Sequence, residues 1–174
     1  HERVWSLGRD RHGNLWIGTD GGGLQRLSGG RLAGLSTKNG LNCDYVWAIR
    51  EDREGSLWVA TNGGGLHRLK DGSVVPFSTR EGLPSEFVWS VRRARDGSLW
   101  VGTEDAGAVR LQGGRVTRFT TREGLASNQV RALLETRDGS VWLGGVGLYR
   151  FRDGRLSRVA LPGLANVRVR ALAE

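Results

Sequence analysis

The chain has 174 residues, with 28 Gly, 3 Pro and no Met, and its 26 Lys and Arg against 18 Asp and Glu give a net charge of +8. No apolar run approaches the roughly 20 residues of a membrane span, and no signal peptide is visible. The arginines are spread along the chain, so we expect no nucleic-acid partner. The single Cys43 excludes an internal disulfide, and the missing initiator Met indicates an excised piece of a longer protein.

The chain repeats itself with a period of 42 residues, as shown by the spacing of Trp16, Trp58, Trp100 and Trp142. A period near this value is typical of propeller blades. The stretch at 56–66 recurs at 14–24 and 98–108, and a degenerate copy lies at 140–148. The last copy is three residues short, and a fifth copy begins after it. The predicted blades are 4–45, 46–87, 88–129 and 130–168, and the start of the next blade is 169–174.

Each copy predicts four short strands separated by turn residues. In the second copy a Gly-ending turn at 52–55 and the hairpin signal Asp71-Gly72 separate strands, and a longer link at 79–87 returns to the next copy. Pro76 cannot donate to a ladder, which places the last strand at an edge. The expected strands of this copy are 46–50, 57–61, 66–69 and 74–78.

Three tight hairpins followed by one long return are typical of a propeller blade, in which the first strand is innermost and the last outermost. The sequence therefore predicts an all-β fold: a β-propeller of four blades, each with four antiparallel strands, plus the first strand of a fifth. We expect residues 1–174 to form a single propeller segment. Four blades and one strand indicate a partial slice of a larger ring, with seven or more blades.

The repeated tryptophans are predicted to be structural. Along the second strand Trp58 and Ala60 point to the same side, and the equivalents of Ala60 are Gly18, Gly102 and Gly144. A large ring beside a small residue allows two sheets to interdigitate. Each buried Trp removes about 150–250 Å² from water. The ring column therefore predicts packing between blades: Trp16, Trp58, Trp100 and Trp142.

At 51–61, and again in the links 77–85 and 119–127, the sequence resembles the two-component regulator propeller repeat. The resemblance covers essentially all of residues 4–168. Three columns depart from the pattern in later copies. The turn residues Asp10 and Asp52 become Ala94 and Thr136, the column of Trp5, Trp47 and Trp89 continues as Arg131, and the column of Thr19, Thr61 and Thr103 continues as Gly145.

The resemblance implies a periplasmic, extracytoplasmic sensing region of a bacterial membrane-bound signalling protein. In that family the repeats precede a membrane span and a histidine kinase or diguanylate cyclase module. The implied partners are the remaining blades, the downstream signalling module, and an unidentified small-molecule or glycan ligand. Contact with a membrane would come only through flanking segments.

Catalytic residues are not apparent. His12 and His67 occupy different positions in their copies, His1 is terminal, and Cys43 has no predictable base. No close set of His, Cys and acidic residues indicates a metal, so we expect neither metal nor cofactor. Streptogramin lyases are propellers with similar Trp-bearing repeats, but this chain offers no His-acid pair for that chemistry. The expected function is non-catalytic sensing, and the alternative is a protein-interaction scaffold.

If a ligand binds, the loops between second and third strands and the links between blades are predicted to share the mouth of the central channel. Residues that differ between copies at that end are the candidates for specificity. Arg131, which replaces a Trp in an innermost strand, either faces a ligand anion or pairs with Glu135 or a neighbouring blade. The candidate ligand-binding residues are Asp20, Asn62, Glu104, Asp44, Glu86, Asn128 and Arg131.

Overall fold

The computed structural model describes residues 3–160, 162 and 167–174. His1 and part of the predicted fourth blade (161 and 163–166) lie outside the described residues. The chain divides into two compact units, His1–Val91 and Arg92–Glu174, called unit 1 and unit 2. No helix in the described part is long and apolar enough to cross a membrane.

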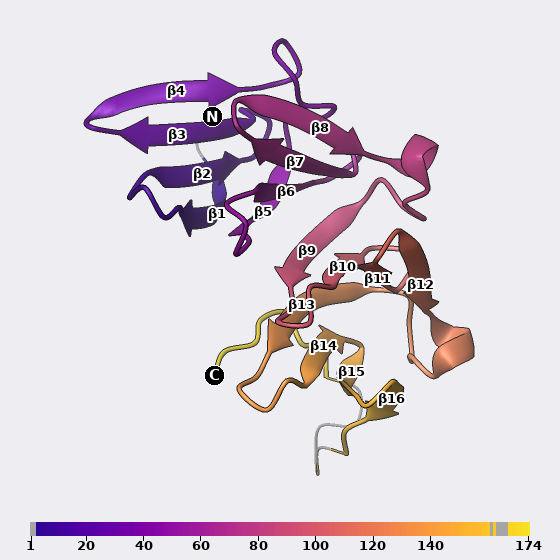
Figure 1. The fold of residues 1–174 in the computed structure, drawn as a ribbon. Coiled ribbons are helices and arrows are strands. Elements are labelled where there is room, and N and C mark those ends of the chain that lie inside the picture. The colour runs from indigo at the N-terminus through magenta and orange to yellow at the C-terminus, as the bar shows by residue number, and fades with distance from the viewer. Residues whose placement is uncertain (1–2, 161, 163–166) are drawn as a thin grey trace. The chain divides into compact units, whose positions relative to one another are not determined.

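Unit 1 contains two antiparallel sheets with strand orders β1-β2-β3-β4 and β5-β6-β7-β8 (Figure 1). Chain order and spatial order coincide, because tight hairpins join each strand to the next. The strands of the first blade are β1 (Val4–Arg9), β2 (Leu15–Thr19), β3 (Leu24–Ser28) and β4 (Arg31–Leu35). Those of the second are β5 (Val46–Glu51), β6 (Leu57–Thr61), β7 (Leu66–Lys70) and β8 (Ser73–Phe77).

The third and fourth sheets have the same order. Strand β9 crosses the boundary between the units. The third blade has β9 (Val88–Arg93), β10 (Leu99–Thr103), β11 (Ala108–Gln112) and β12 (Arg115–Phe119). The fourth has β13 (Val130–Glu135), β14 (Val141–Gly145), β15 (Gly147–Arg152) and β16 (Arg155–Arg158).

These four sheets of four antiparallel strands confirm the all-β propeller blades predicted from the sequence. Asp71 and Gly72 have φ of 49° and 78°, the two positive values of a type I′ hairpin. Pro76 lies in β8 at the sheet edge, as predicted. The turn glycines before each second strand have φ between 80° and 82°: Gly13, Gly55, Gly97 and Gly139. The ring size and the extent of a single propeller segment remain predictions.

Two links contain short 3-10 helices that the sequence analysis did not predict. These are η1 (Thr79–Glu81) and η2 (Thr121–Glu123). Each begins with a capping box, in which Ser78 or Thr120 exchanges hydrogen bonds with the Glu three residues later. A three-residue helix has no hydrophobic periodicity, so only the Ser/Thr-x-x-Glu spacing could have revealed it.

Adjacent blades interlock within each unit at the small residue of the second strand. A Cβ added to Gly18 would lie 2.7 Å from Cγ1 of Val46, the first residue of the next blade. Gly144 has the same relation to Val169, also at 2.7 Å. Val169 therefore occupies the place of a first-strand residue, and the small column leaves room for a β-branched side chain from the following copy.

Candidate functional site

The loops after the second strands and the links between blades meet at one end of each blade. In unit 1, backbone N–H groups of Gly23 and Gly65 donate to the carbonyls of Asp44 and Glu86, both at 2.9 Å. In unit 2, Gly107 donates to Asn128 and Gly147 to Val167, both at 2.8 Å. The two loop sets therefore share an end, which we call the link end.

Three of the candidate residues hold the links in shape. The Asp44 carboxylate accepts hydrogen bonds from the backbone N–H and the hydroxyl of Thr37. Glu86 does the same for Thr79, and the Asn128 side-chain oxygen accepts from the N–H of Thr121 at 3.0 Å. In the first three copies, Asp, Glu and Asn thus all supply an acceptor oxygen to the link. A ligand-binding role for Asp44, Glu86 and Asn128 stays a prediction.

Three further candidates lie at the ends of second strands, with half-buried side chains. Asp20 and Asn62 form isolated antiparallel bridges with Tyr45 and Phe87. Glu104 occupies the equivalent place in unit 2. Tyr45 and Phe87 are 47% and 42% exposed, so unit 1 presents aromatic rings beside polar side chains at its link end.

The second residue of each first strand forms a stack of rings in unit 1. Trp5 and Trp47 stack with ring centroids 5.1 Å apart and planes 3° from parallel, and Trp47 and Trp89 stack at 5.7 Å and 6°. Register shifts occur at this position in β1 and β5, and such bulges redirect a side chain. Trp5, at the end of the stack, is 48% exposed. Sequence analysis noted this column but did not predict the stacking.

Arg131 takes the same strand position in unit 2. Burial lowers the pKa of its guanidinium, as do the charges of Arg170 and Arg168, whereas Glu104 opposes the shift. Glu135, the partner considered from the sequence, accepts a hydrogen bond from the backbone N–H of Arg95 at 2.8 Å. Glu104 is thus an acidic group that acts on Arg131.

His67 joins a link to the next blade. It is fully buried, and its Nε2 accepts a hydrogen bond from the backbone N–H of Asn42 at 2.9 Å. In unit 2 the equivalent pair is Ala126, which donates to the hydroxyl of Tyr149 at 2.6 Å. The corresponding pair in the remaining copy is Pro84, which has no N–H, and Val109, which has no acceptor. His67 is thus a structural acceptor.

We expect His67 to make the chain less stable as the pH falls below about 6.5. Burial lowers the pKa of His67, against the opposing charge of Glu86. The unfolded chain then takes up a proton that the folded chain refuses, so stability is retained above the unfolded pKa and declines below it. His67→Tyr, which copies Tyr149, should reduce this decline when denaturant unfolding is measured between pH 7.5 and 5.5. The exposed His12→Asn is the control, and an unchanged profile in H67Y would contradict the assignment.

The tryptophans of the second strands are anchored by polar partners in the turns. The Nε1–H of Trp16 donates to Asp10 at 2.8 Å and that of Trp58 to Asp52 at 2.8 Å. Where the turn aspartate is missing, Trp100 donates to Ser98 and Trp142 to Thr136, both at 3.1 Å. An arginine of the third strand lies over each ring, at 5.6–5.9 Å from its centroid: Arg26, Arg68, Arg110 and Arg150. Each ring thus has a hydrogen-bond partner at its Nε1–H and an arginine over its face.

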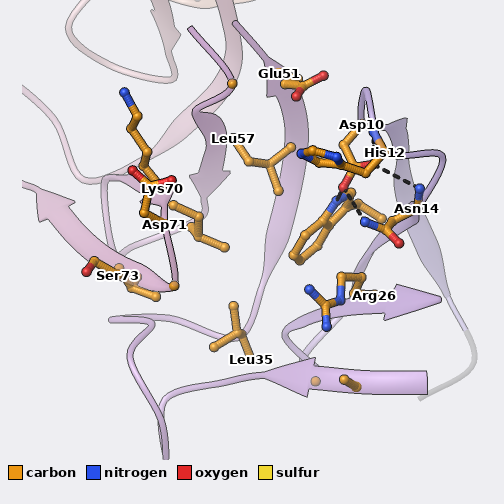
Figure 2. Close-up of a pocket in the computed structure, with 17 residues that line it drawn as sticks. Asp10, His12, Asn14, Arg26, Leu35, Glu51, Leu57, Lys70, Asp71 and Ser73 are labelled. Atoms are coloured by element: carbon orange, nitrogen blue, oxygen red, sulfur yellow. Dashed lines mark hydrogen bonds between the residues drawn. The ribbon is translucent and has the colours of Figure 1, made fainter. Parts of the chain in front are cut away.

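A cleft of about 480 Å³ opens beside Trp16 in unit 1 (Figure 2). It lies between the first and second blades and extends from the turns opposite the link end to Leu35 at the end of β4. Asp10 borders it and keeps a lowered pKa: burial raises the value, but hydrogen bonds from Asn14 and Trp16 outweigh that effect. Its charged lining residues are Asp10, Arg26, Glu51, Lys70 and Asp71, and His12 also borders it.

The cleft arises because leucines replace phenylalanines. Leu35 and Leu69 line it, and their equivalents in unit 2 are Phe119 and Phe151. Those two rings pack on Trp100 at centroid distances of 5.2 and 4.8 Å and fill the corresponding space. The cleft was not predicted, because the sequence does not show that Leu35 and Leu69, from different blades, meet beside Trp16.

Leu69→Phe is expected to raise the free energy of unfolding by about 0.5–1.5 kcal/mol, the value of an added aromatic contact in a core. The new ring would enter the cleft beside Trp16, as Phe151 does beside Trp100. Denaturant unfolding followed by circular dichroism measures the change. Leu27 occupies the same strand position in the first blade and is 37% exposed. Leu27→Phe is therefore the control, and it should change stability by less than about 0.5 kcal/mol. A destabilised L69F would show that the cleft cannot accept a ring.

The described residues contain no group of three or more His, Cys, Asp or Glu side chains that could hold a metal ion. Cys43 is partly buried, and its thiol donates to the carbonyl of Asn62 at 3.1 Å. The link end presents aromatic rings, hydrogen-bonding groups and arginines, and charged side chains line the cleft.

The four-stranded sheets, joined in sequence order and packed through repeated Trp and Gly positions, define β-propeller blades. The chain belongs to the two-component regulator propeller family, whose model matches residues 1–21, 40–63, 82–105 and 124–147. No protein of curated function matches the sequence.

Solved structures of similar fold include two from B. thetaiotaomicron. The extracellular domain of the putative hybrid two-component system BT3049 is 26% identical with a TM-score of 0.75, over 85% of this chain and 21% of that one. The corresponding domain of BT4673 is 22% identical with a TM-score of 0.78, over 95% of this chain and 25% of that one. Virginiamycin B lyase from Staphylococcus aureus shares the fold at 18% identity and a TM-score of 0.77, over 97% of this chain and 58% of the lyase. The chain thus spans about a fifth to a quarter of the two-component structures.

Proposed function

We propose that this chain is a non-catalytic, signal-sensing propeller segment of a bacterial membrane-bound signalling protein, placed outside the cytoplasmic membrane. The observation that carries the proposal is the four-fold match to the two-component regulator propeller model. The similarity to extracellular domains of hybrid two-component systems supports it. In the proposed protein, ligand occupancy at the propeller is passed to a histidine kinase or diguanylate cyclase module.

The link end is the proposed ligand site. Asp20, Asn62 and Glu104 present polar side chains there, and Tyr45 and Phe87 add exposed rings in unit 1. Rings with nearby hydrogen-bonding groups suit small molecules and glycans, which need both an apolar face and directional polar contacts. The residues that hold the links, such as Asp44 and Glu86, would keep this surface in shape.

The reading frame beyond Glu174 gives the first test. A membrane-spanning segment followed by a kinase or cyclase domain is expected, whereas a soluble end or a secretion tag would overturn the sensing proposal in favour of an interaction scaffold. In the parent protein, Asn62→Ala should shift the ligand dose that activates the output module. Asn39→Ala, at an exposed link turn, is the control for altered folding of the links.

The proposed absence of catalysis is supported by the surroundings of the two histidines that the structure describes. His67 is buried and uses Nε2 to accept a hydrogen bond, and His12 lies in an exposed turn. The likeness to virginiamycin B lyase shows a shared fold, so lyase activity deserves a direct assay. Incubation of the purified chain with a streptogramin B substrate should leave the substrate intact, and linearised product would contradict the proposal.

A further inference from the structure

Two arginines stand where unit 1 has stacked tryptophans. Arg131 and Arg170 occupy the strand position of Trp5 and Trp47. Val130, just before Arg131, pairs with Gly145, and the N–H of Val169, just before Arg170, donates to the Gly145 carbonyl at 2.8 Å. The two arginines therefore follow residues that both pair with Gly145. Trp5 and Trp47, at the same strand positions in unit 1, stack with ring centroids 5.1 Å apart.

A third arginine joins them at the same end. Arg168 forms a bridge with Val146, and it takes the place that Tyr45 and Phe87 occupy in unit 1. Arg168 and Arg170 are exposed, whereas Arg131 is half-buried. Both act on Arg131 as like charges, and Glu104 is the opposite charge that acts on it. Arg131 is thus repelled by two arginines and attracted by one carboxylate.

Two columns at the link end carry fewer acids in unit 2 than in unit 1, although Asp105 adds a carboxylate in the loop after β10. The positions of Asp20, Asp44 and Glu86 in unit 1 correspond in unit 2 to one acid, Glu104, and otherwise to neutral residues: Asn128, Val146 and Val167. The arginines stand in two other columns at this end, those of Tyr45 and Trp5. Because like charges held close together repel, this arrangement is stabilised by an added anion.

We propose that Arg131, Arg168 and Arg170 form a binding site for an oxyanion, a carboxylate, sulfate or phosphate group carried by the ligand of this propeller. Guanidinium groups bind such groups through paired hydrogen bonds. The three guanidinium groups outnumber the one carboxylate that acts on Arg131, Glu104. The inference deepens the proposed function by naming the class of ligand, and it rests on that function only for the biological role of binding.

The test measures the melting temperature of the purified chain in rising sodium sulfate, phosphate, acetate or glucuronate, against sodium chloride at equal ionic strength. A ligand that binds only the folded state raises the melting temperature. Arg170→Gln and Arg131→Gln should each weaken the apparent affinity for the best anion about tenfold or more, the effect of losing one charge-assisted contact. Arg115→Gln, an exposed arginine at the β11–β12 turn, is the matched control for net charge.

A distinctive result is expected from Arg170→Gln in chloride alone. Removing one of three like charges should leave the chain at least as stable as the parent, while the response to the oxyanion is lost. Equal responses of the parent chain, R170Q and R115Q to every anion would overturn the inference, because sulfate also stabilises proteins non-specifically. A response to glucuronate and acetate but not to sulfate or phosphate would assign a carboxylate; the reverse would assign a sulfate or phosphate.

The two proposals fail separately. Anion binding is read from the chain alone, without any output module. Binding by a chain whose gene encodes no signalling module would leave the arginine site standing and remove the sensing role. Absence of anion binding in a chain that precedes a kinase or cyclase would remove the arginine site and leave the sensing role standing.

Discussion

Trp100→Ala is expected to lower the free energy of unfolding by about 3–5 kcal/mol, as for other large truncations in a core. Trp100 is 1% exposed. Its ring stacks on Phe119 at 5.2 Å and meets Phe151 edge-on at 4.8 Å, and those two rings contact each other at 5.2 Å. Truncation would leave a cavity bounded by both phenylalanines and would remove the surface on which Arg110 lies.

Denaturant unfolding followed by far-ultraviolet circular dichroism measures this loss, since the signal reports β-sheet and not the deleted fluorophore. Trp16→Ala is the matched variant in unit 1. Its ring borders the cleft and packs beside leucines, so a smaller loss of about 1–2 kcal/mol is expected. A loss below about 1 kcal/mol for W100A, or equal losses for the two variants, would contradict the difference in packing between the two places.

The parts of the fold that follow local backbone rules were predictable from the sequence. Asp71-Gly72 predicted a hairpin because few residue pairs accept two positive φ values, and Pro76 predicted an edge because it lacks an N–H. Copies of one strand could also be compared with one another, which predicted that the tryptophan column packs, and Trp100 is buried. Each of these inferences needs only residues that lie near one another in the chain.

Features that depend on pairs from different blades were not predicted. The cleft beside Trp16 requires Leu35 of one blade and Leu69 of the next to be small together, and a copy-by-copy comparison does not show which two meet. The stacking of Trp5 on Trp47 likewise depends on bulges that the sequence does not reveal. Variation between Asp44, Glu86 and Asn128 was interpreted as freedom to specialise, yet all three supply an acceptor oxygen to a link threonine.

Gly107→Ala is expected to lower the free energy of unfolding by about 2–4 kcal/mol, from left-handed backbone strain and a steric clash together. Gly107 has a φ of +79°, and an added Cβ would overlap the carbonyl oxygen of Phe119. The oxygen belongs to backbone at the end of β12, so it cannot turn away as a side chain would. Relief would require the loop to move, which would break the hydrogen bond from the Gly107 N–H to the Asn128 carbonyl, now at 2.8 Å.

Gly113→Ala separates the two contributions. Gly113 also has a positive φ, +55°, but an added Cβ would meet nothing within 4 Å. Gly113→Ala should therefore lower the free energy of unfolding by about 1 kcal/mol, from backbone strain alone. The same denaturant measurement on both variants gives the difference as the value of the close approach between loop and strand. Because Gly107 also ties its loop to the link, G107A should weaken any ligand response at the link end, whereas G113A should leave it unchanged. Equal losses in the two variants would show that the loop yields freely and does not hold the link end in shape.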